Sequence, residues 1–522
     1  MGLLLVLAAS ALTAACLLAL FVRRRRYRGA LRGSAHRDDV FPTRLPPATF
    51  EVVPGPAGFE LPPGVKTDGQ TVFLHLSVAS TLLGRLFDPF IAVALRNTVG
   101  NPVEFRATSD VAPAPPEVGT WHFQSFERGA RGMRYLNLSP LFARRVAGPE
   151  EIRGRIELRG RFLRWSARGA LLLFPRVPAE VEEGTCLVLA PHPDDAEIAT
   201  FGMYARRPRR AWVVTVTAGE RGSAALSPLI ATDARARWLG DVRVHDSLSI
   251  PPGLAGVPPA HCANLVYPDG RLEEMWRAPD QAFALACEAE MPRAVLRARN
   301  PSTLLAGPGP AGRVSAGCTW NGLVAELGRL LESVKPGVVL CPHPLIDSHA
   351  DHVFTAVALD AALHGLGLAT PRPAIWLYAV HLRELPLHPF GPPEALASLP
   401  PGEPSSSRSS PSSGSLADAI VSLPLSPDLR RAKYLAIEAA HDLRHQEALA
   451  PRTLGQLLRL VKREISSYLA SLPPNPQSFL RRAPRPNEIY YLVSPDSLAD
   501  LVERALAARP ASQKPTAVPR PG

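Results

Sequence analysis

Charged residues and paired cysteines are both scarce in this chain of 522 residues. Only 20% of the residues are Asp, Glu, Lys or Arg and 46% are hydrophobic, so the chain can bury substantial cores, and its length favours two domains with tails. The formal charge of +11 comes from scattered Lys and Arg, without a basic stripe interleaved with aromatic residues. This argues against binding to nucleic acid. The six cysteines show no paired spacing, which is typical of a reducing compartment or of ordinary core positions.

The amino terminus lacks charge until a cluster of arginines. Residues 2–22 are uncharged and apolar, long enough for the hydrocarbon core of a bilayer, and six arginines follow between Arg23 and Arg32. No positive charge precedes the apolar run, which argues against a secretory signal peptide. We expect a transmembrane anchor over residues 1–22 and a basic linker over 23–45, with the rest of a single-pass membrane protein on the cytoplasmic side. A cleaved or lipidated leader, with Leu12–Cys16 as a poor lipobox, is the competing interpretation.

Residues 46–178 are rich in short strand-like segments separated by Pro and Gly clusters, at 71–78, 91–95, 103–105 and 121–123. In the clearest segment, 151–162, apolar and charged side chains alternate with a period of two, as in a half-exposed antiparallel strand. We predict a small all-β sandwich or barrel. The row of arginines on its outer face is a candidate contact for acidic lipid headgroups or a glycan, although a solvated strand face is the simpler interpretation.

Two clusters of polar residues each follow a short apolar strand. The first lies in Leu187-Val-Leu-Ala-Pro-His-Pro-Asp-Asp-Ala-Glu197, where three carboxylates beside an imidazole would repel one another without a cation or a proton between them. The second ends in His349-Ala-Asp-His352, whose two imidazoles can face the same way at the start of a helix. Open α/β sheets build their sites at such strand ends. Because catalytic zinc takes three His or carboxylate ligands and keeps a position for water, the clusters predict one shared metal site.

The pairing of His192-Pro-Asp-Asp-Ala-Glu197 with His349-Ala-Asp-His352 resembles the PIG-L/LmbE family of zinc-dependent N-acetylglucosaminyl de-N-acetylases. The resemblance covers residues 183–493 and implies an α/β fold with a Rossmann-like, mostly parallel sheet flanked by helices. It does not reach the all-β segment. Composition further predicts a flexible Pro/Ser insert at 400–415 and a disordered tail at 509–522. We also expect a helix over 196–205, a last edge strand at 490–493 and a helix cap at Asn321, and we interpret His381 as a loop histidine.

The resemblance also implies how the metal would be held. Its ligands would be His192, Asp195 and His352, with zinc as the expected ion, although iron, cobalt and manganese suit the same ligand types. Asp194 would be the general base that accepts a proton from the attacking water. The division of roles between Asp194 and Asp195 follows the family pattern, not their spacing. We interpret Glu197 as support for the start of the helix.

Other roles carried over from the resemblance concern the substrate. A protonated His349, held charged by Asp351, would stabilise the oxyanion. Asp269 matches a family residue that contacts substrate, and Arg221 follows a Gly-Glu pair similar to a family loop beside the metal; a plain turn explains either segment as well. Arg235 keeps the Arg of a family helix, but the usual Glu is missing, so we transfer no sugar contact to it.

The expected function is therefore removal of an acetyl group from an N-acetylated amino sugar of the N-acetylglucosamine type, possible substrates including a lipid-linked glycan. Two alternatives stay open. One is another zinc amidase of the same family that cleaves amide or thiol conjugates. The other is a non-catalytic glycan- or protein-binding module in which the β domain is the active part and the metal is structural.

Overall fold

The computed structural model describes residues 48–97, 121–142, 154–177, 183–221, 234–302, 318–366, 372–400, 416–441 and 479–509, with gaps at 56, 64, 66–70, 86, 176, 383–384 and 386–387. The expected anchor over residues 1–22, the basic linker, the strand at 103–105, the Pro/Ser insert and the tail beyond 509 lie outside these ranges. Within the described ranges, no helix has both the length and the apolar character needed to span a bilayer.

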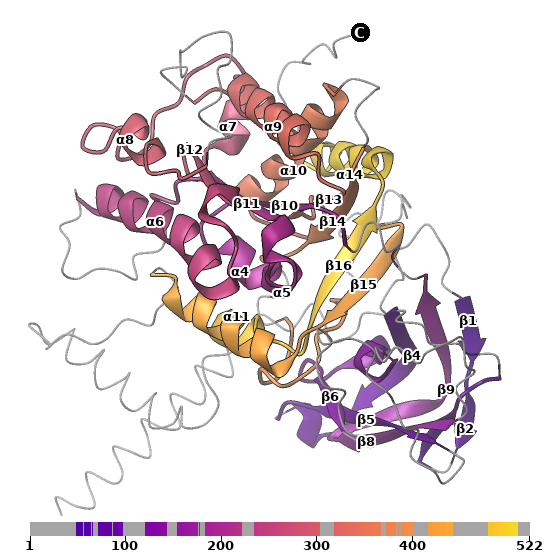
Figure 1. Ribbon diagram of the computed structural model, residues 1–522. Helices are drawn as coiled ribbons and strands as arrows, with labels where there is room; N and C mark the ends of the chain where they lie inside the picture. The colour runs from indigo at the N-terminus through magenta and orange to yellow at the C-terminus, as the bar shows by residue number, and fades with distance from the viewer. Residues whose placement is uncertain are drawn as a thin grey trace, which may run out of the picture.

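Residues 48–174 form two antiparallel sheets, seen at the indigo end of the ribbon in Figure 1. Their facing sides enclose one cluster of buried apolar side chains. Strand burial alternates most clearly at the start of β8, where Ile156 and Leu158 are buried and the intervening Glu157 is partly exposed. The first sheet has the order β1-β9-β4-β7, with β1 Ala48–Glu51, β4 Thr71–Ser80, β7 Arg131–Asn137 and β9 Leu163–Phe174. The second has the order β2-β3-β8-β5-β6, with β2 Val53–Gly55, β3 Gly58–Glu60, β5 Phe90–Asn97, β6 His122–Ser125 and β8 Gly154–Arg161.

A seven-stranded sheet of order β12-β11-β10-β13-β14-β16-β15 forms the centre of the second domain. The first five strands in this order are parallel, and β16 pairs antiparallel with both β14 and β15. The strand order reverses between β10 and β13, and such a switch point leaves a crevice at the carboxyl ends of the strands. The strands are β10 Cys186–Ala190, β11 Ala211–Thr217, β12 Cys262–Tyr267, β13 Val338–Pro342, β14 Ala374–Tyr378, β15 Ala419–Pro424 and β16 Asn487–Val493.

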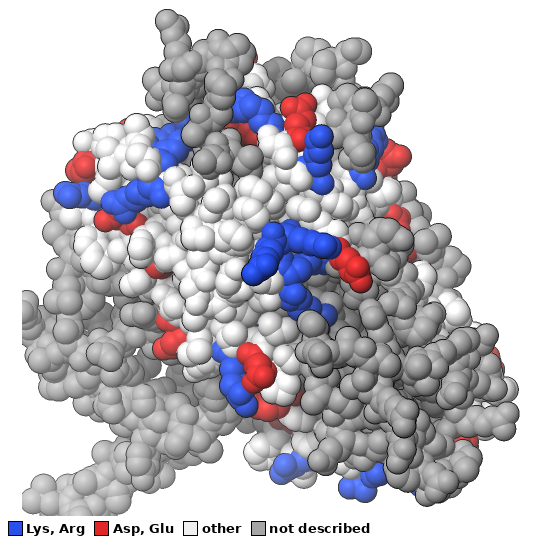
Figure 2. Space-filling view, viewed as in Figure 1, with Lys and Arg blue, Asp and Glu red and all other residues white. Residues whose placement is uncertain are grey.

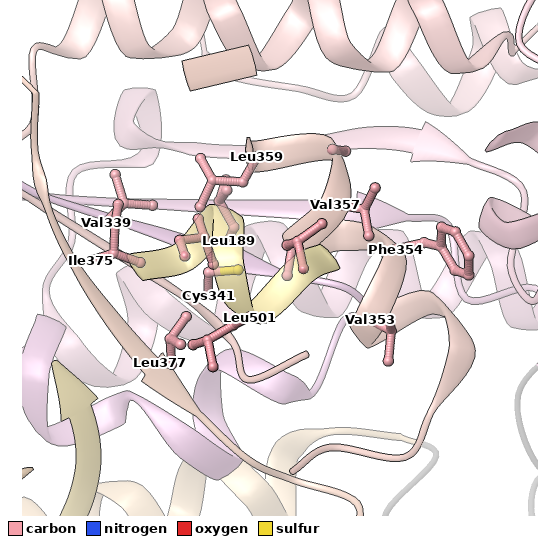
Figure 3. Close-up of a cluster of buried hydrophobic side chains, with 14 of the residues drawn as sticks. Leu189, Val339, Cys341, Val353, Phe354, Val357, Leu359, Ile375, Leu377 and Leu501 are labelled. Carbon is pink, nitrogen blue, oxygen red and sulfur yellow. The ribbon is translucent and has the colours of Figure 1, made fainter. Parts of the chain in front are cut away.

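Helices cover both faces of this sheet because successive strand residues point to opposite sides (Figure 1). Leu189, Cys341 and Leu377 pack on one side with Phe354 and Leu501, as Figure 3 shows. That side is covered by α7 Leu272–Arg277, α9 Trp320–Val334, α10 Ala350–His364 and α14 Pro495–Ala507. The other side is covered by α4 Asp195–Ala199, α5 Phe201–Ala205, α6 Arg235–Ala255 and α11 Pro427–Ala439. The expected α/β class is confirmed. The remaining short helices are α2 Ser139–Phe142, α8 Arg293–Arg297 and α13 Phe479–Arg482, with 3-10 turns η1 Leu83–Arg85, η2 Pro208–Arg210 and η4 Pro259–His261.

The two domains are joined by buried polar side chains beside β15. The amide nitrogens of Asn137 and Asn487 both donate to the carbonyl of Ala397 (2.8 and 3.0 Å) and to the hydroxyl of Ser422 (2.9 and 3.0 Å). The backbone N–H of Ser422 also donates to the hydroxyl of Thr71 at 2.9 Å. Because buried amides are costly to leave unpaired, this network fixes the β sandwich against the second domain.

Three local expectations differ from the structure. The expected helix over residues 196–205 is divided at Thr200, whose hydroxyl donates to the carbonyl of Ala196 and whose φ of −127° is not helical. The expected edge strand at 490–493 lies inside the sheet as β16, and β15 is the edge. The capping residue of α9 is Thr319, which accepts from Gly322 N, so the cap expected at Asn321 was wrong.

Candidate metal centre

The first polar loop follows β10, with its side chains fixed by the start of α4. The Pro191 carbonyl accepts bonds from the backbone N–H and the hydroxyl of Thr217, which ties the loop to β11. The backbone N–H of His192 donates to Asp195 Oδ2 at 2.9 Å. Since Asp195 opens α4, its carboxylate is turned back over the loop. His192 and Asp195 therefore lie on the same side of this strand end.

The second polar loop follows β13 and leads into α10. The backbone N–H of His349, at the N-cap of α10, donates to Asp347 Oδ1 at 3.0 Å. His352 lies in the first turn of the helix and is 0% exposed. The strand pairing of β10 with β13 brings this helix start next to the first loop.

Three side-chain atoms from the two loops form a nearly equilateral triangle. His192 Nδ1 lies 3.2 Å from His352 Nε2 and 3.2 Å from Asp195 Oδ2, and His352 Nε2 lies 3.0 Å from Asp195 Oδ2. Three tetrahedral ligands about 2.0–2.1 Å from a zinc ion are roughly 3.3 Å apart. The imidazole centroids of His192 and His352 are 5.1 Å apart, so the two loops do converge. The triangle fits a divalent ion with one or more further positions for other ligands.

A second layer of carboxylates contacts the outer nitrogens of both imidazoles. Asp347 Oδ2 lies 2.9 Å from His352 Nδ1 and also accepts bonds from the backbone N–H groups of Val380 and His381. On the other ring, His192 Nε2 lies 3.3 Å from an oxygen of Asp351 and 3.3 Å from one of Asp269. Such outer carboxylates set the tautomer and orientation of metal-binding imidazoles.

The carboxylates hold positive charge at both imidazoles. Burial alone lowers the pKa of His352, but Asp195 and Asp347 raise it to about 10. Burial also opposes charge on His192, yet Asp195, Asp269 and Asp351 hold its pKa well above the usual value. The buried cluster thus favours extra positive charge, which a divalent ion supplies when it displaces protons from its ligands.

Asp194 contacts an arginine of α6. Its Oδ1 accepts a bond from Arg243 Nη2 at 3.0 Å, and Arg243 Nη1 donates to the carbonyl of Gly219 at 3.0 Å. Gly219 has a φ of +69°, and a Cβ there would lie 2.8 Å from this guanidinium. The glycine therefore allows Arg243 to reach Asp194. Of these two adjacent residues, Asp195 therefore belongs to the triangle and Asp194 binds an arginine.

His349 and His381 lie close to the triangle. The centroid of His349 is 4.7 Å from that of His192, and the centroid of His381 is 4.9 Å from that of His352. Burial and the nearby charges of His192 and His352 lower the pKa of His349, and its buried Nδ1 has no hydrogen-bond partner among the described residues. Asp351 contacts His192 and the backbone N–H groups of Gly270 and Leu272, and its charge also acts to raise the pKa of His349, so the expected pairing of these two residues stays a prediction. His381, interpreted from sequence as a loop histidine, is a neighbour of the site.

The other expected site residues lie at its edge or beneath it. Asp269 faces His192, which lowers its pKa to about 2 although burial raises it, and its Oδ2 accepts from the backbone N–H of Arg221. The Arg221 side chain is exposed. Glu220 is buried below, where it accepts from the backbone N–H of Asp269. Glu197 is buried too and accepts from the Tyr204 hydroxyl; burial raises its pKa to about 8.

Two residues of the site were missed by sequence reasoning. Asp347 lies within the second cluster, and an acid five positions before a ligand histidine was a usable signal. Arg243 gave no such signal, because it lies in the middle of a long helix and its partner, Asp194, is 49 residues away in the sequence.

A cavity of about 110 Å³ has none of the residues of the triangle in its lining. Its wall includes Ile198 of α4, Val380, whose N–H donates to Asp347, and Phe479, whose ring centroid is 6.0 Å from that of His381. Most of its lining is apolar, with Lys433, Arg482, Arg485 and Glu488 as the charged members. The face shown in Figure 2 otherwise carries its Lys and Arg in separate small groups among neutral areas.

Comparison with known proteins gives one family match within this chain. A family model described as PIG-L, GlcNAc-PI de-N-acetylase, matches residues 187–363, the segment that contains both polar loops. A search of curated proteins found no match. Similar solved structures include GalB, the 4-carboxy-2-hydroxymuconate hydratase from Pseudomonas putida KT2440 (14% identity over 59% of this chain and 95% of that one, TM-score 0.28). Another is the zinc-inhibited form of the teicoplanin deacetylase Orf2 (16% identity, 59% and 97%, TM-score 0.23). At these TM-scores, neither structure carries an argument about this chain, and the family match covers about a third of it.

Proposed function

We propose that this chain, whose residues 187–363 form a domain of the PIG-L family of de-N-acetylases, is a metal-dependent hydrolase that removes the acetyl group from an N-acetylated amino sugar. The observation that carries the proposal is the triangle of His192, Asp195 and His352 with Asp194 beside it. The family match supports a deacetylase-type hydrolase, and N-acetylglucosamine as the sugar is the finer part of the proposal.

The three residues of the triangle would hold the ion, with zinc the ion we expect. When bound, such an ion supplies Lewis acidity and lowers the pKa of a water from about 16 towards about 7. Asp347 contacts the outer nitrogen of His352, and both Asp351 and Asp269 contact the outer nitrogen of His192. These contacts keep the ligand nitrogen of each imidazole facing inward. Asp347 and Asp351 act through the ligands, whereas Asp269, at the edge of the site, is also the proposed substrate contact.

Asp194 is the general base of the proposed reaction. It accepts a proton as the water oxygen attacks the acetamide carbonyl carbon, and Arg243 holds the carboxylate in place from the other side. The C–N bond then breaks, the proton passes to the departing nitrogen, and the products are acetate and the free amine. Asp194 is suited to this role because its side chain lies next to the ligand Asp195 without belonging to the triangle.

His349 is the group that stabilises the developing oxyanion. Its pKa is lowered, so the neutral imidazole donates an N–H to the carbonyl oxygen as negative charge develops there.

The test is acetate release by the full-length, zinc-loaded chain on a panel of substrates. The panel contains N-acetylglucosamine, N-acetylglucosaminides with apolar aglycones, and acetylated thiol or amine conjugates without a sugar. We expect turnover of the glycosides and its loss in Asp194→Asn. Turnover of the conjugates alone would show that the substrate is another amide and not an amino sugar. Zinc binding without turnover of any acetylated compound would overturn the proposal that the chain is a hydrolase.

A further inference from the structure

One end of the β sandwich exposes large apolar side chains. In the turn between β4 and β5, here named the apical loop (residues 81–85, 87 and 88), Leu82 is 75% exposed, Leu83 47% and Phe87 54%. Eight large hydrophobic residues are exposed in the described part of the chain, and this single turn holds three of them. Isolated exposed leucines are ordinary, but a group in one loop marks a surface that contacts something apolar.

The apical loop is held in place by its neighbours. The backbone N–H of Thr81 donates to the carbonyl of Phe162 at 2.9 Å, and the Gly84 carbonyl accepts from Gly129 N at 3.0 Å. A Cβ at Gly84 would lie 2.3 Å from the Phe162 carbonyl, so the turn is packed tightly at its base. The ring of Phe87 lies 5.6 Å from that of Phe162. The leucines thus protrude from a well-bonded turn.

Arginines surround this apolar group. Arg85 lies in the apical loop, Arg131 follows the adjacent β6–β7 turn, and Arg161 and Arg164 flank the β8–β9 turn; all four are exposed. The two acidic residues of these three turns are paired, Asp88 with Arg128 at 2.7 Å and Glu127 with Arg134. This end of the sandwich therefore presents apolar side chains inside a ring of positive charge.

The direction of β4 places this surface away from the metal centre. Strand β4 begins at Thr71, whose hydroxyl accepts the bond from Ser422 of the second domain, and it ends at Ser80 next to the apical loop. A strand of ten residues spans about 33 Å, so the loop lies at the far end of the sandwich. It has no part in the site already described.

We propose that the apical loop inserts into the headgroup region of an anionic lipid bilayer. Leucine and phenylalanine side chains at the tip would enter the interface while the surrounding arginines contact lipid phosphates and carboxylates. A second copy of this chain fits less well, because two such tips would bring like-charged arginines together. The proposal is independent of residues 1–22 and of the reaction at the metal centre.

The experiment places an environment-sensitive fluorophore at the tip of the full-length chain through Leu83→Cys. The five cysteines in the described residues are free and buried, and the labelled parent chain measures any background. Val53→Cys is the matched control, because Val53 is 62% exposed in the same domain but lies at the other end of the sandwich. Val53 pairs with Glu60, and Glu60 pairs with Arg155. Arg155 lies at the opposite end of β8 from Arg161. Each protein is mixed with vesicles of phosphatidylcholine alone or with about one third phosphatidylserine.

We expect a blue shift at position 83 and quenching by brominated lipids, with anionic vesicles only, and neither change at position 53. Replacing Arg85, Arg161 and Arg164 by Gln in the labelled protein should lower the vesicle partition coefficient by roughly fivefold for each arginine. Equal signals at positions 53 and 83 would overturn the proposal. A blue shift at position 83 that depends on protein concentration in the absence of vesicles would indicate binding of a second copy and would also overturn the proposal. A blue shift produced by an oligonucleotide and not by vesicles would overturn it too.

Discussion

At the carboxyl end of the parallel sheet Asp195, Asp351 and His352 are at most 1% exposed, whereas at the far end of the sandwich Leu82 and Phe87 are more than half exposed. Each region reverses the usual division between a polar surface and an apolar core. The buried polar groups compensate one another: every ring nitrogen of His192 and His352 has a carboxylate within 3.3 Å. The exposed leucines have no such compensation within the described chain.

This difference separates two kinds of functional surface. A cluster of buried charges is stable only when an ion, protons or hydrogen bonds balance it, so its function can be deduced from its internal geometry. An exposed apolar loop is covered by a partner outside the molecule. The structure therefore shows what kind of surface the partner must have, and an experiment must identify the partner. The predictions below test whether the buried cluster works as one unit and whether the loop is independent of it.

The largest effect is expected from His352→Ala, which removes one corner of the triangle. Two ligands cannot hold a catalytic ion well, so bound zinc should fall well below one per chain and acetate release should drop by roughly a thousandfold or more. Metal content is measured by native mass spectrometry. His364→Ala is the control, because His364 is an exposed histidine on the same helix, and it should retain both metal and activity. Full zinc occupancy in His352→Ala would remove this residue from the ligand set.

Asp194→Asn and Asp195→Asn should separate two adjacent carboxylates by their roles. Asparagine at 194 keeps a polar contact with Arg243 but accepts no proton from water, so acetate release should fall about 10²–10⁴-fold with metal retained. Asparagine at 195 should release the metal, because Asp195 contributes Oδ2 to the triangle. Loss of metal from the 194 variant, with retention by the 195 variant, would exchange the two assignments.

The sequence allowed the convergence of the two polar clusters to be predicted because each lies within a few residues of a strand end. The apolar runs before His192 and after Gly337 indicated buried strands, and side chains at the ends of neighbouring parallel strands meet at one edge of the sheet. The partner of Asp351 could not be predicted this way. Its contact with His192 joins residues 159 apart, and the rotation of α10 about its axis decides which imidazole it faces.

The apical loop was not predicted at all, for a different physical reason. Leu82, Leu83 and Phe87 sit in an apolar stretch that continues through Leu86 towards β5, and from sequence alone such a stretch is typical of a buried segment. Only the bonds of Thr81 and Gly84 to neighbouring turns show that the chain reverses here with its apolar side chains outward. The sequence pattern shows which residues are apolar, whereas the tertiary contacts decide which of these residues are buried in the folded protein.

Glu197→Gln should change how stability depends on pH. Burial raises the pKa of Glu197 to about 8, above its value near 4.5 in the unfolded chain, so the folded state binds the extra proton between these values. Native glutamate therefore loses stability as pH rises from about 5 to 8, while glutamine does not ionise and can still accept from Tyr204. The melting temperature of the variant relative to the parent should rise with pH, by an amount equivalent to at most about 5 kcal/mol at pH 9. A constant difference from pH 5 to 9 would show that this carboxyl is ionised throughout.

A smaller effect is expected from Asp347→Asn, because Asp347 contacts the metal ligand and not the ion. Losing the charged bond to His352 Nδ1 should weaken zinc binding by about 10–100-fold, as measured by competition with a chelator. Saturating zinc should then restore most of the acetate release, which a merely misfolded variant would not show. Unchanged zinc affinity would restrict Asp347 to its backbone contacts with Val380 and His381.

The smallest effect tests the independence of the two regions. Leu83→Ser changes a side chain that is 47% exposed and lies at the far end of β4 from the junction at Thr71, so it should leave stability within about 0.5 kcal/mol. Acetate release from a water-soluble N-acetylglucosaminide should stay within about twofold of the parent, since additivity holds between distant sites without shared partners. The same variant should lose activity on a substrate embedded in anionic vesicles if docking by the apical loop brings the enzyme to it. A loss on the soluble substrate as well would mean that the sandwich transmits the change to the metal centre, and the two regions would then have to be treated as one coupled unit.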